Sequence, residues 1–324
     1  MKAVNIRMVA KEAGTSISSV SRYLNDAPGV SPSVRRKIGE AIRKLDYRFH
    51  SPEKHQIAVI LPALTAAVFG EYSIQLIGAL RSAIARRGYP CILLSRDDCW
   101  ILNENSICGV LSLDYLNEMR LEFPNMKNIP LVCLNDRGNW LENVYSVQTD
   151  EEKGIDEAVE FLFLRHHRRI ALLVCREKNK ILCTEKREEA FRRKSRELGI
   201  ENSCMIQTHD KELSIVEAIS ITLEKQCTGV IVAGEDFEAE ALHALAMFGK
   251  RIPEDISVIT YETIDSCQRT PRQTTIGQDF HSLAEESLQL LEQIAAGEES
   301  LHDIRIPPIF TIRESVQDLP TPLS

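Results

Sequence analysis

The segment "AGTSISSVSRYLN", residues 13–25, gathers four serines, one threonine and one arginine, side chains that could form a turn, act as a nucleophile or contact nucleic acid. Small hydroxyl groups and helix N-termini hold phosphates, and an arginine can form a bidentate pair with guanine. A serine nucleophile on a strand-to-helix turn needs the pattern G-x-S-x-G, and "GTSIS" lacks the second glycine. The residue types therefore favour contact with nucleic acid over nucleophilic catalysis.

The first fifty residues carry a positive charge that the rest of the chain does not share. Residues 1–50 contain ten Lys or Arg against four Asp or Glu, a net charge of +6. Because the whole chain has a formal charge of −8, the remaining residues carry −14. A basic segment attached to an acidic body predicts a polyanionic partner for that segment alone.

Length and composition predict a globular protein. The chain has 324 residues, enough for two or three domains, and 44% of them are hydrophobic. Its sequence has no run of about 18 apolar residues, and the start "MKAVNIRMVAKEAG" mixes charges with apolar residues. We therefore expect a soluble, cytoplasmic protein without a membrane segment.

The cysteines and histidines do not have the spacing of metal sites. Nine cysteines are spread along the chain, and an odd number of them in strings such as "LLVC" is typical of reduced thiols packed as small hydrophobic residues. The string "RHHRR" at 165–169 has adjacent histidines, which rarely ligate one ion. We expect no metal and no other cofactor.

Residues 5–24 have the pattern of two short helices joined by a tight turn. Asn5 can cap a helix whose apolar residues recur every three or four positions, and Gly14 follows where left-handed backbone angles are needed. A second helix is expected over 17–24, with Ser16 as its N-cap. Two helices joined through a short glycine turn form a helix-turn-helix.

A third helix is expected in "SPSVRRKIGEAIRKLDY", where Ser31 can cap it and Pro32 takes the first helical position. Its apolar residues lie on one stripe that can close a small core over the first two helices. Short side chains beside one long guanidinium suit a helix that enters the DNA major groove. The second helix would present such a set away from the core: Ile17, Ser18, Ser21 and Arg22.

From residue 56 onward, buried strands alternate with amphipathic helices. Hydrophobic strings such as "QIAVILP", "ICGVLSL" and "IPLVCLN" precede a second series with "RRIALLVC", "TGVIVAGE" and "DISVITYE". This alternation predicts two similar α/β lobes, each with a parallel sheet flanked by helices. The chain is expected to cross between the lobes at 160–168 and 273–280, and "IRIPPIFTIRES" to form one closing strand.

The string "VNIRMVAKEAGTSISSVSRYLNDAPGVSPSVRRKIGEAIRKLDY" resembles the DNA-binding head of the lactose/galactose repressor (LacI-type) family, and a weaker resemblance continues to the C-terminus. The resemblance implies a transcription repressor. It also implies which residues read bases, namely Ile17, Ser18 and Arg22. The residues that it implies at phosphate-binding positions are Asn5, Ser16, Ser21, Asn25 and Ser31.

The resemblance further implies a three-helix helix-turn-helix head followed by a two-lobed α/β periplasmic-binding-protein-like module. We expect the head at 1–50, a shortened linker at 51–56, and an effector-binding and dimerisation domain at 57–324. The expected partners are a double-stranded DNA operator, a second copy of the chain, and a carbohydrate-like effector such as a sugar or an amino-substituted sugar.

The effector is expected between the lobes, because α/β folds place ligands at the carboxyl ends of strands. Asn135 and Asp136 are alternatives for one aspartate of the family, the first by spacing and the second by identity. Glu235 and Glu262 stand where the family has Asn and Asp, which favours an amino-substituted or donor-rich ligand. The other candidates follow from the family's motifs: Phe69, Arg187, Gln278 and Phe280.

Two segments depart from the family. Its members have a hinge with the pattern N-x-x-A-R-x-L, whose leucine enters the minor groove, whereas this chain has "RFHSPEKHQIAVILP". Without that apolar wedge, less DNA bending is expected. The crossover at 96–106 has 11 residues, about the minimum for a link between parallel strands, so its helix must be reduced.

An effector-responsive DNA-binding repressor is therefore the predicted function. A regulator controlled by a protein partner, or by no effector, is the alternative within the same class. The alternative from another class is an enzyme of nucleoside-hydrolase or kinase type with an accessory head. That enzyme would need clustered Asp ligands or a phosphate loop, and the sequence has no P-loop, G-x-G-x-x-G or H-E-x-x-H string, so we expect no enzyme.

Overall fold

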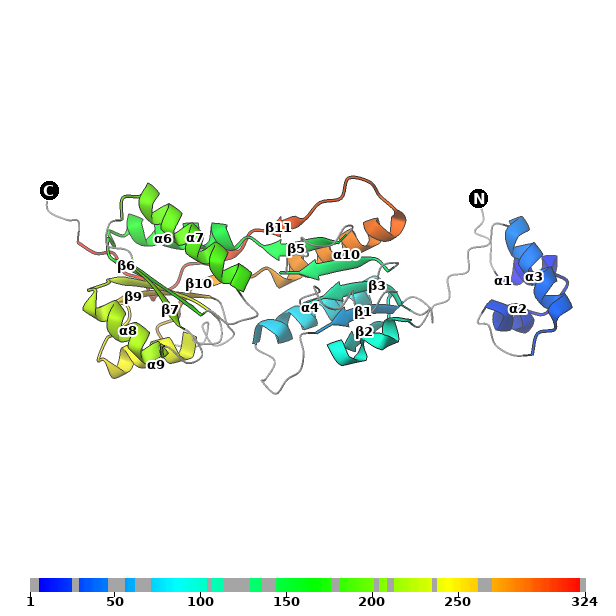
Figure 1. Ribbon diagram of the computed structural model, residues 1–324, viewed down its shortest axis with the longest axis horizontal. Helices are drawn as coiled ribbons and strands as arrows, with labels where there is room; N and C mark the ends of the chain where they lie inside the picture. The colour runs from blue at the N-terminus through cyan, green and yellow to red at the C-terminus, as the bar shows by residue number, and fades with distance from the viewer. Residues whose placement is uncertain are drawn as a thin grey trace.

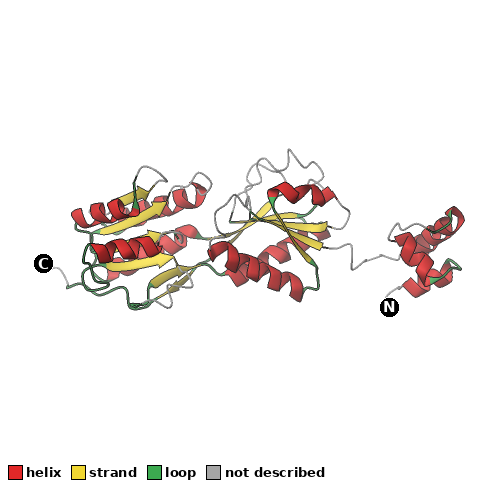
Figure 2. Ribbon diagram, turned by 90° about the horizontal axis from the view of Figure 1, so that it is seen from below, coloured by secondary structure: helices red, strands yellow, loops and turns green. Residues whose placement is uncertain are grey.

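Helices form a small N-terminal unit, and two sheets, each covered by helices, form the rest of the chain (Figures 1 and 2). The computed structural model describes residues 6–24, 29–45, 56–61, 71–103, 107–113, 129–135, 144–175, 181–200, 204–208, 213–234, 238–261 and 270–320. No helix within these ranges is both long and apolar enough to cross a membrane.

The N-terminal unit, referred to below as the head, consists of α1 (Ile6–Glu12), α2 (Ile17–Leu24) and α3 (Pro32–Leu45). The predicted bounds of the second helix and the first residue of the third are confirmed. Val9, Val20 and Ile38 are fully buried in one core to which all three helices contribute. Gly14 joins α1 to α2 with a φ of +61°, a left-handed conformation that costs other L-residues about 1–2 kcal/mol. The tight turn therefore depends on glycine.

The first lobe is built on a parallel sheet with strand order β11-β5-β4-β3-β1-β2. Its strands are β1 (Gln56–Ile60), β2 (Cys91–Leu94), β3 (Ile107–Ser112), β4 (Leu131–Leu134), β5 (Tyr145–Thr149) and β11 (Ile304–Ile306). One face packs against α4 (Glu71–Arg86) and α10 (Phe280–Ala296). The other face packs against η1 (Arg96–Asn103), a 3-10 helix. The described part of the short crossover, residues 96–103, thus forms a 3-10 helix in place of an α-helix, in agreement with the length of the crossover.

The second lobe is built on a sheet with strand order β12-β10-β9-β8-β6-β7, in which only β12 runs antiparallel to its neighbour. Its strands are β6 (Ile170–Cys175), β7 (Cys204–Thr208), β8 (Gly229–Ala233), β9 (Ser257–Tyr261), β10 (Thr274–Gly277) and β12 (Ile309–Thr311). α6 (Glu151–Leu164) and α7 (Ile181–Glu197) cover one face. α8 (Ile215–Glu224) and α9 (Glu238–Met247) cover the other. The two predicted α/β lobes are confirmed.

The described chain passes between the two lobes three times: at 149–151, 277–280 and 306–309. The crossing predicted at 273–280 is confirmed, but the one predicted at 160–168 is wrong. Residues 160–168 end α6 and enter β6 inside the second lobe. The first crossing occurs earlier because Asp150 caps α6 directly after β5, its side chain accepting from the Lys153 N–H at 3.2 Å.

The prediction of one closing strand in "IRIPPIFTIRES" is also wrong. Pro307 and Pro308 have no N–H to donate, and they separate two three-residue strands that belong to different sheets. α6 lies against this third crossing: a Cβ on Gly154 would come within 3.2 Å of Pro308 and 2.8 Å of Ile276. A glycine in α6 is therefore required for the close approach of the helix.

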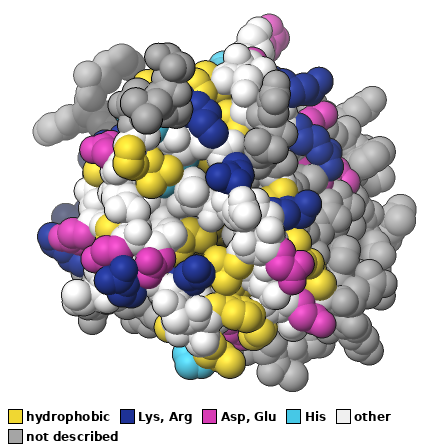
Figure 3. Space-filling view, turned by 90° about the vertical axis from the view of Figure 1, so that its left-hand side faces the viewer, with side chains coloured by type: hydrophobic (Ala, Val, Ile, Leu, Met, Phe, Trp, Pro, Cys, Tyr) yellow, Lys and Arg dark blue, Asp and Glu magenta, His cyan; other side chains and the backbone are white. Residues whose placement is uncertain are grey.

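The outer end of the second lobe shows side chains of both charges interspersed with hydrophobic ones (Figure 3). Ion pairs are one reason for this mixture in the lobe, for example Arg193 with Asp156 at 2.9 Å and Arg251 with Asp255 at 2.9 Å. The visible face has no broad field of one sign, in contrast to the basic first fifty residues.

His167 anchors the C-terminal segment to the second lobe. It is fully buried, and its Nε2–H donates to the Gln317 carbonyl at 3.1 Å, so Nδ1 accepts from the Thr228 hydroxyl at 2.9 Å. Burial lowers the pKa of His167 below 6.5; Arg165 and Arg168 act in the same direction, while the Gln317 carbonyl and Asp318 oppose them. The folded state therefore holds this side chain neutral.

We expect the free energy of unfolding to fall as the pH drops below about 6.5, because the unfolded chain then binds a proton that folded His167 rejects. Urea midpoints between pH 8 and pH 5 measure this slope. His167→Gln should flatten it, whereas His243→Gln, at an exposed histidine, should leave it unchanged. Equal slopes in all three proteins would contradict the role of His167.

Candidate DNA-binding surface and interlobe site

α2 presents a polar face to solvent. Val20 is buried in the core of the head, whereas the exposed fraction of Ile17 is 46% and Ser18 and Arg22 are also exposed. Ser21 is half-buried. Among the described residues, Arg22 has neither an ion pair nor a hydrogen bond. Its guanidinium is therefore available to a ligand of the head.

Hydroxyl groups cluster at the start of α2. The Ser16 hydroxyl accepts from the backbone N–H of Ser19 at 3.1 Å, which confirms Ser16 as a side-chain cap. It also lies 2.8 Å from the Ser18 hydroxyl and 2.9 Å from the Ser19 hydroxyl. Such a group of donors at a helix N-terminus suits a phosphate.

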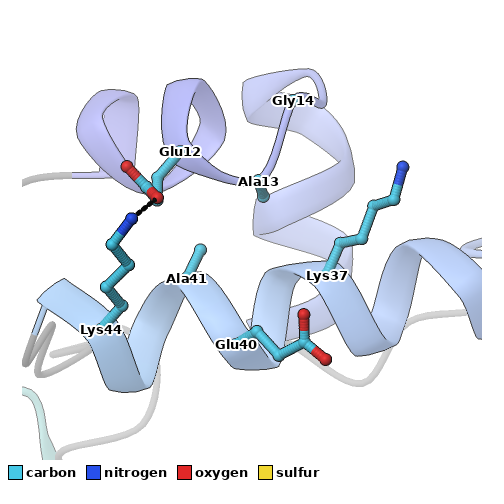
Figure 4. A pocket seen from close by; sticks show the side chains of 7 residues that line it. All are labelled: Glu12, Ala13, Gly14, Lys37, Glu40, Ala41 and Lys44. Atoms are coloured by element: carbon cyan, nitrogen blue, oxygen red, sulfur yellow. Dashed lines mark hydrogen bonds and ion pairs between the residues drawn. The ribbon is translucent and has the colours of Figure 1, made fainter.

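An ion pair fixes α1 on α3 behind this face. Lys44 donates to Glu12 at 2.6 Å, and this hydrogen bond raises the pKa of Lys44. Figure 4 shows the pair bridging the two helices beside a pocket that Ala13 and Gly14 also line. Because Gly14 leads directly into α2, the pair helps to hold α2 in place.

Further cations surround the helices. Lys11, Arg36 and Lys37 are exposed on α1 and α3, and the Arg35 guanidinium lies 5.7 Å from the centre of the Tyr23 ring. A group of cations of this kind attracts a polyanion without regard to its sequence. The head thus combines a general electrostatic attraction with the particular face of α2.

Of the remaining predicted phosphate-binding residues, Ser31 is exposed directly before α3, and its hydroxyl lies 3.1 Å from that of Ser33. Asn5 and Asn25 lie outside the described residues.

Asn135 ties two crossings together at the carboxyl end of β4. Its Oδ1 accepts from the Thr149 N–H at 2.8 Å, and its Nδ2 donates to Gln278 Oε1 at 3.0 Å and to the Tyr72 hydroxyl at 2.6 Å. The Thr149 hydroxyl also donates to Gln278 Oε1, at 2.9 Å. Asn135 has a φ of +53°, a conformation that asparagine tolerates better than most residues. The Tyr72 ring packs against the Phe280 ring, with 5.8 Å between the ring centres.

Arg187 lies in a nearly buried ion pair of the second lobe. Its side chain is 12% exposed and that of Glu151 is 5% exposed; Arg187 Nε donates to Glu151 Oε2 at 2.7 Å. Arg187 also donates to the Ala233 carbonyl at 2.9 Å. Its guanidinium carbon lies 4.0 Å from the centre of the Tyr261 ring, over which it stacks. The Tyr261 hydroxyl donates to the same Glu151 oxygen at 2.7 Å.

The neighbouring Lys186 reaches the first lobe. Its ammonium donates to Gln148 Oε1 of β5 at 2.9 Å, and Gln148 Nε2 donates to the Ser146 hydroxyl at 2.7 Å. The start of α7 thus contributes both a contact between the lobes and a paired guanidinium.

The structure brings Asn135, Gln278 and Phe280 into one group and places Arg187 in another, at the carboxyl ends of β8 and β9. The other predicted effector residues, Phe69, Asp136, Glu235 and Glu262, lie outside the described residues. Sequence reasoning missed four participants: Tyr72, Thr149, Glu151 and Tyr261. Glu151 carried one usable signal, because "TDEE" is typical of the first turn of a helix that directly follows a strand.

Comparison with protein families gives two matches. Residues 5–49 match the bacterial regulatory proteins of the lacI family, and residues 159–316 match a periplasmic binding protein-like domain. The first match contains the head and the second contains most of the second lobe.

Full-length relatives extend these matches. The chain is 24% identical to the ribose operon repressor of Lactococcus lactis, over 96% of this chain and 98% of that protein. It is 26% identical to the transcriptional repressor PurR of Vibrio cholerae, over 97% of this chain and 98% of that protein. Among solved structures, the lac repressor dimer bound to operator and the anti-inducer ONPF has the same fold, with a TM-score of 0.68 and 23% identity over 98% of this chain and 100% of that chain.

A helix-turn-helix head joined to a two-lobed periplasmic-binding-protein-like module defines a bacterial DNA-binding regulatory protein. Over nearly its whole length the chain is similar to repressors of the lacI type, and it acts as a DNA-binding regulator of transcription.

We expect Tyr261→Phe to lower the free energy of unfolding by about 1.5–3 kcal/mol, the usual range for a hydrogen bond to a charged group. The ring and its stacking with Arg187 remain in this variant, so the loss reports the hydroxyl on Glu151. Denaturant unfolding of Tyr261→Phe, Glu151→Gln and the double variant measures the coupling. A Tyr261→Phe cost that is the same in the Glu151→Gln background would show that the two side chains act independently.

Proposed function

We propose that the protein is a homodimeric repressor that binds an operator through α2 and responds to a neutral or amino-substituted sugar between its lobes. The observation that carries the DNA part is the exposed face of α2, which presents Ser18 together with Arg22, an arginine that has no ion pair or hydrogen bond with another described residue. Short side chains allow the helix backbone to approach base edges, and the arginine supplies a bidentate contact with guanine.

Each residue of this face has a proposed role. Ile17, Ser18 and Arg22 read bases, because they are the exposed members of α2. We assign phosphate contacts to Ser16 and Ser31, which directly precede α2 and α3, to Ser21 within α2 and, from the sequence alone, to Asn5 and Asn25.

The domain organisation is proposed as it was expected: head at 1–50, linker at 51–56, and effector and dimerisation module at 57–324. Helices α1–α3 lie within 1–50, whereas β1 begins at Gln56, one residue before the proposed start of the module. A dimer is supported by the lac repressor, whose solved structure is a dimer on its operator. We further propose that the chain acts in the cytoplasm and is not an enzyme, which the regulatory function of its relatives supports.

We expect Arg22→Ala to cost about 1–3 kcal/mol of operator affinity and to relax the preference at one base position in each half-site. Arg36→Ala is the matched control, since it removes an exposed arginine of α3 that lies 4.0 Å from Glu40. It should weaken binding to specific and to non-specific DNA alike. The salt dependence of the affinity should fall by about one released counterion. Binding to a library of operator variants measures both effects.

Uniform losses from both substitutions across the library would contradict base reading by Arg22. A relaxed preference in Arg36→Ala, with none in Arg22→Ala, would move base reading from α2 to α3.

The effector proposal rests on the pairing of Arg187. Glu151 neutralises the guanidinium, and the Ala233 carbonyl takes a further N–H, so this group offers little to an anionic ligand. The nearby cation, Lys186, already holds Gln148. Asn135, Gln278 and Thr149 are hydrogen-bonded to one another, and their amide and hydroxyl groups can both donate to and accept from a ligand that replaces those bonds.

Sugars fit this chemistry, and relatives support them as the ligand class. Two of the relatives are repressors of ribose operons, and related structures contain ribose or cellobiose. A neutral sugar or an amino-substituted sugar is therefore the proposed effector. A regulator that answers to a protein partner, or to no effector, is the alternative.

Calorimetry with neutral, amino-substituted and phosphorylated sugars tests the effector class. We expect binding by a neutral or amino-substituted sugar and none by phosphorylated forms. In Glu151→Gln the guanidinium loses its counter-charge, so affinity for phosphorylated sugars should rise. Tight binding of a phosphorylated sugar by the original protein, abolished in Arg187→Ala, would overturn the proposal; no binding in the whole panel would favour the partner-controlled alternative.

A further inference from the structure

Two cysteine thiols meet in the second lobe, far apart in the sequence and on the side away from the interlobe site. Cys204 is the first residue of β7, and Cys227 follows α8 shortly before β8. Their sulfur atoms are 3.4 Å apart. Both strands run parallel to β6, so the pair lies at the amino ends of the strands, opposite the carboxyl ends that carry Ala233 and Tyr261.

We propose that Cys204 and Cys227 form a redox modification site, a dithiol that a hydroperoxide converts into a reversible disulfide. The sulfurs are already in contact, so forming the bond requires a small local adjustment and no rearrangement of the sheet. Cys204 belongs to the edge strand β7, which pairs only with β6 among the described strands. An edge position allows that adjustment more easily than the centre of the sheet.

The two thiols have different environments, which assigns their roles. Cys204 is half-buried, whereas Cys227 is buried. The hydrogen bond from Cys227 lowers the pKa of Cys204, and the positive charge of Lys225 acts in the same direction. The same hydrogen bond, together with burial, raises the pKa of Cys227. Cys204 is therefore the thiolate that reacts, and Cys227 is the thiol that resolves.

The reaction proceeds in two balanced steps. The Cys204 thiolate attacks one oxygen of a hydroperoxide ROOH, the O–O bond breaks, and a sulfenic acid forms while RO⁻ leaves and takes a proton from solvent. The Cys227 thiol, deprotonating as it reacts, then attacks the sulfenic sulfur, and the hydroxyl group leaves as water. Two thiols are oxidised by two electrons, and the hydroperoxide is reduced to an alcohol, or to water when R is hydrogen.

Other described cysteines lack this arrangement. Cys91 and Cys108 have pKa values raised mainly by burial. A raised pKa keeps a thiol protonated, and a protonated thiol is a poor nucleophile. The thiols of Cys108 and Cys99 donate to the Gln56 and Ser95 carbonyls, each at 3.4 Å.

The experiment uses the full-length, reduced protein and hydrogen peroxide in small molar excess. Peptide mapping without reductant should find a Cys204–Cys227 linkage, which dithiothreitol reverses. The cross-link closes a loop around α8, so the oxidised protein should unfold at a melting temperature higher by on the order of 5 °C. The half-buried Cys91 serves as the matched control, and Cys91→Ser should react as the original protein does.

Two variants separate the roles. Cys204→Ser should slow consumption of peroxide by about tenfold or more, because the reactive thiolate is gone. Cys227→Ser should stop at a sulfenic acid on Cys204, which dimedone traps. Oxidation of other cysteines before any Cys204–Cys227 linkage forms, or peroxide consumption unchanged in Cys204→Ser, would overturn the proposal. DNA and sugar binding enter none of these measurements, so the result is independent of the proposed effector.

Discussion

The carboxylate of Glu151 is the constraint on which the interlobe site depends. A buried charge is costly unless it is paired and hydrogen-bonded, and this one receives the Arg187 guanidinium and the Tyr261 hydroxyl on the same oxygen. Because Glu151 opens α6 directly after the first crossing, the pairing connects that crossing to the carboxyl end of β9. The same pairing neutralises the Arg187 guanidinium, which is the reason that we propose an effector without a negative charge.

The head obeys a different constraint, which is electrostatic and local. Its net charge of +6 is opposed by −14 over the rest of the chain, so attraction to DNA belongs to the head. The Lys44–Glu12 pair links α1 to α3, and the Gly14 turn sets how α2 follows α1, so both contribute to the position of the α2 face that we propose meets the DNA. In the proposed function, arginine and hydroxyl side chains on that face add selectivity to an attraction that alone would be indifferent to sequence. Affinity and recognition would then reside in different side chains of the same three helices.

Local signals predicted most of the fold. Three of these signals act within a few residues and were interpreted correctly: the cap at Ser16, the proline at position 32 and the length of the 96–106 crossover. The crossings between the lobes were harder to predict from the sequence. A chain that leaves one sheet for another looks locally like a strand followed by a helix, as at Thr149–Glu151. The same limit explains the site: Asn135 and Gln278 were named, but their shared partner Thr149 lies in a strand that has no distinctive composition. Pairs such as Glu151 with Arg187, or Cys204 with Cys227, depend on tertiary contact between segments that sequence spacing does not connect.

Recognition of an operator by α2 of two symmetric copies can be tested with a nuclease protection experiment on DNA that the full-length protein selects from a random pool. We expect two protected half-sites with inverted, related sequences, one for each head of the dimer. A single protected half-site, or a selected pool without a common sequence, would contradict it.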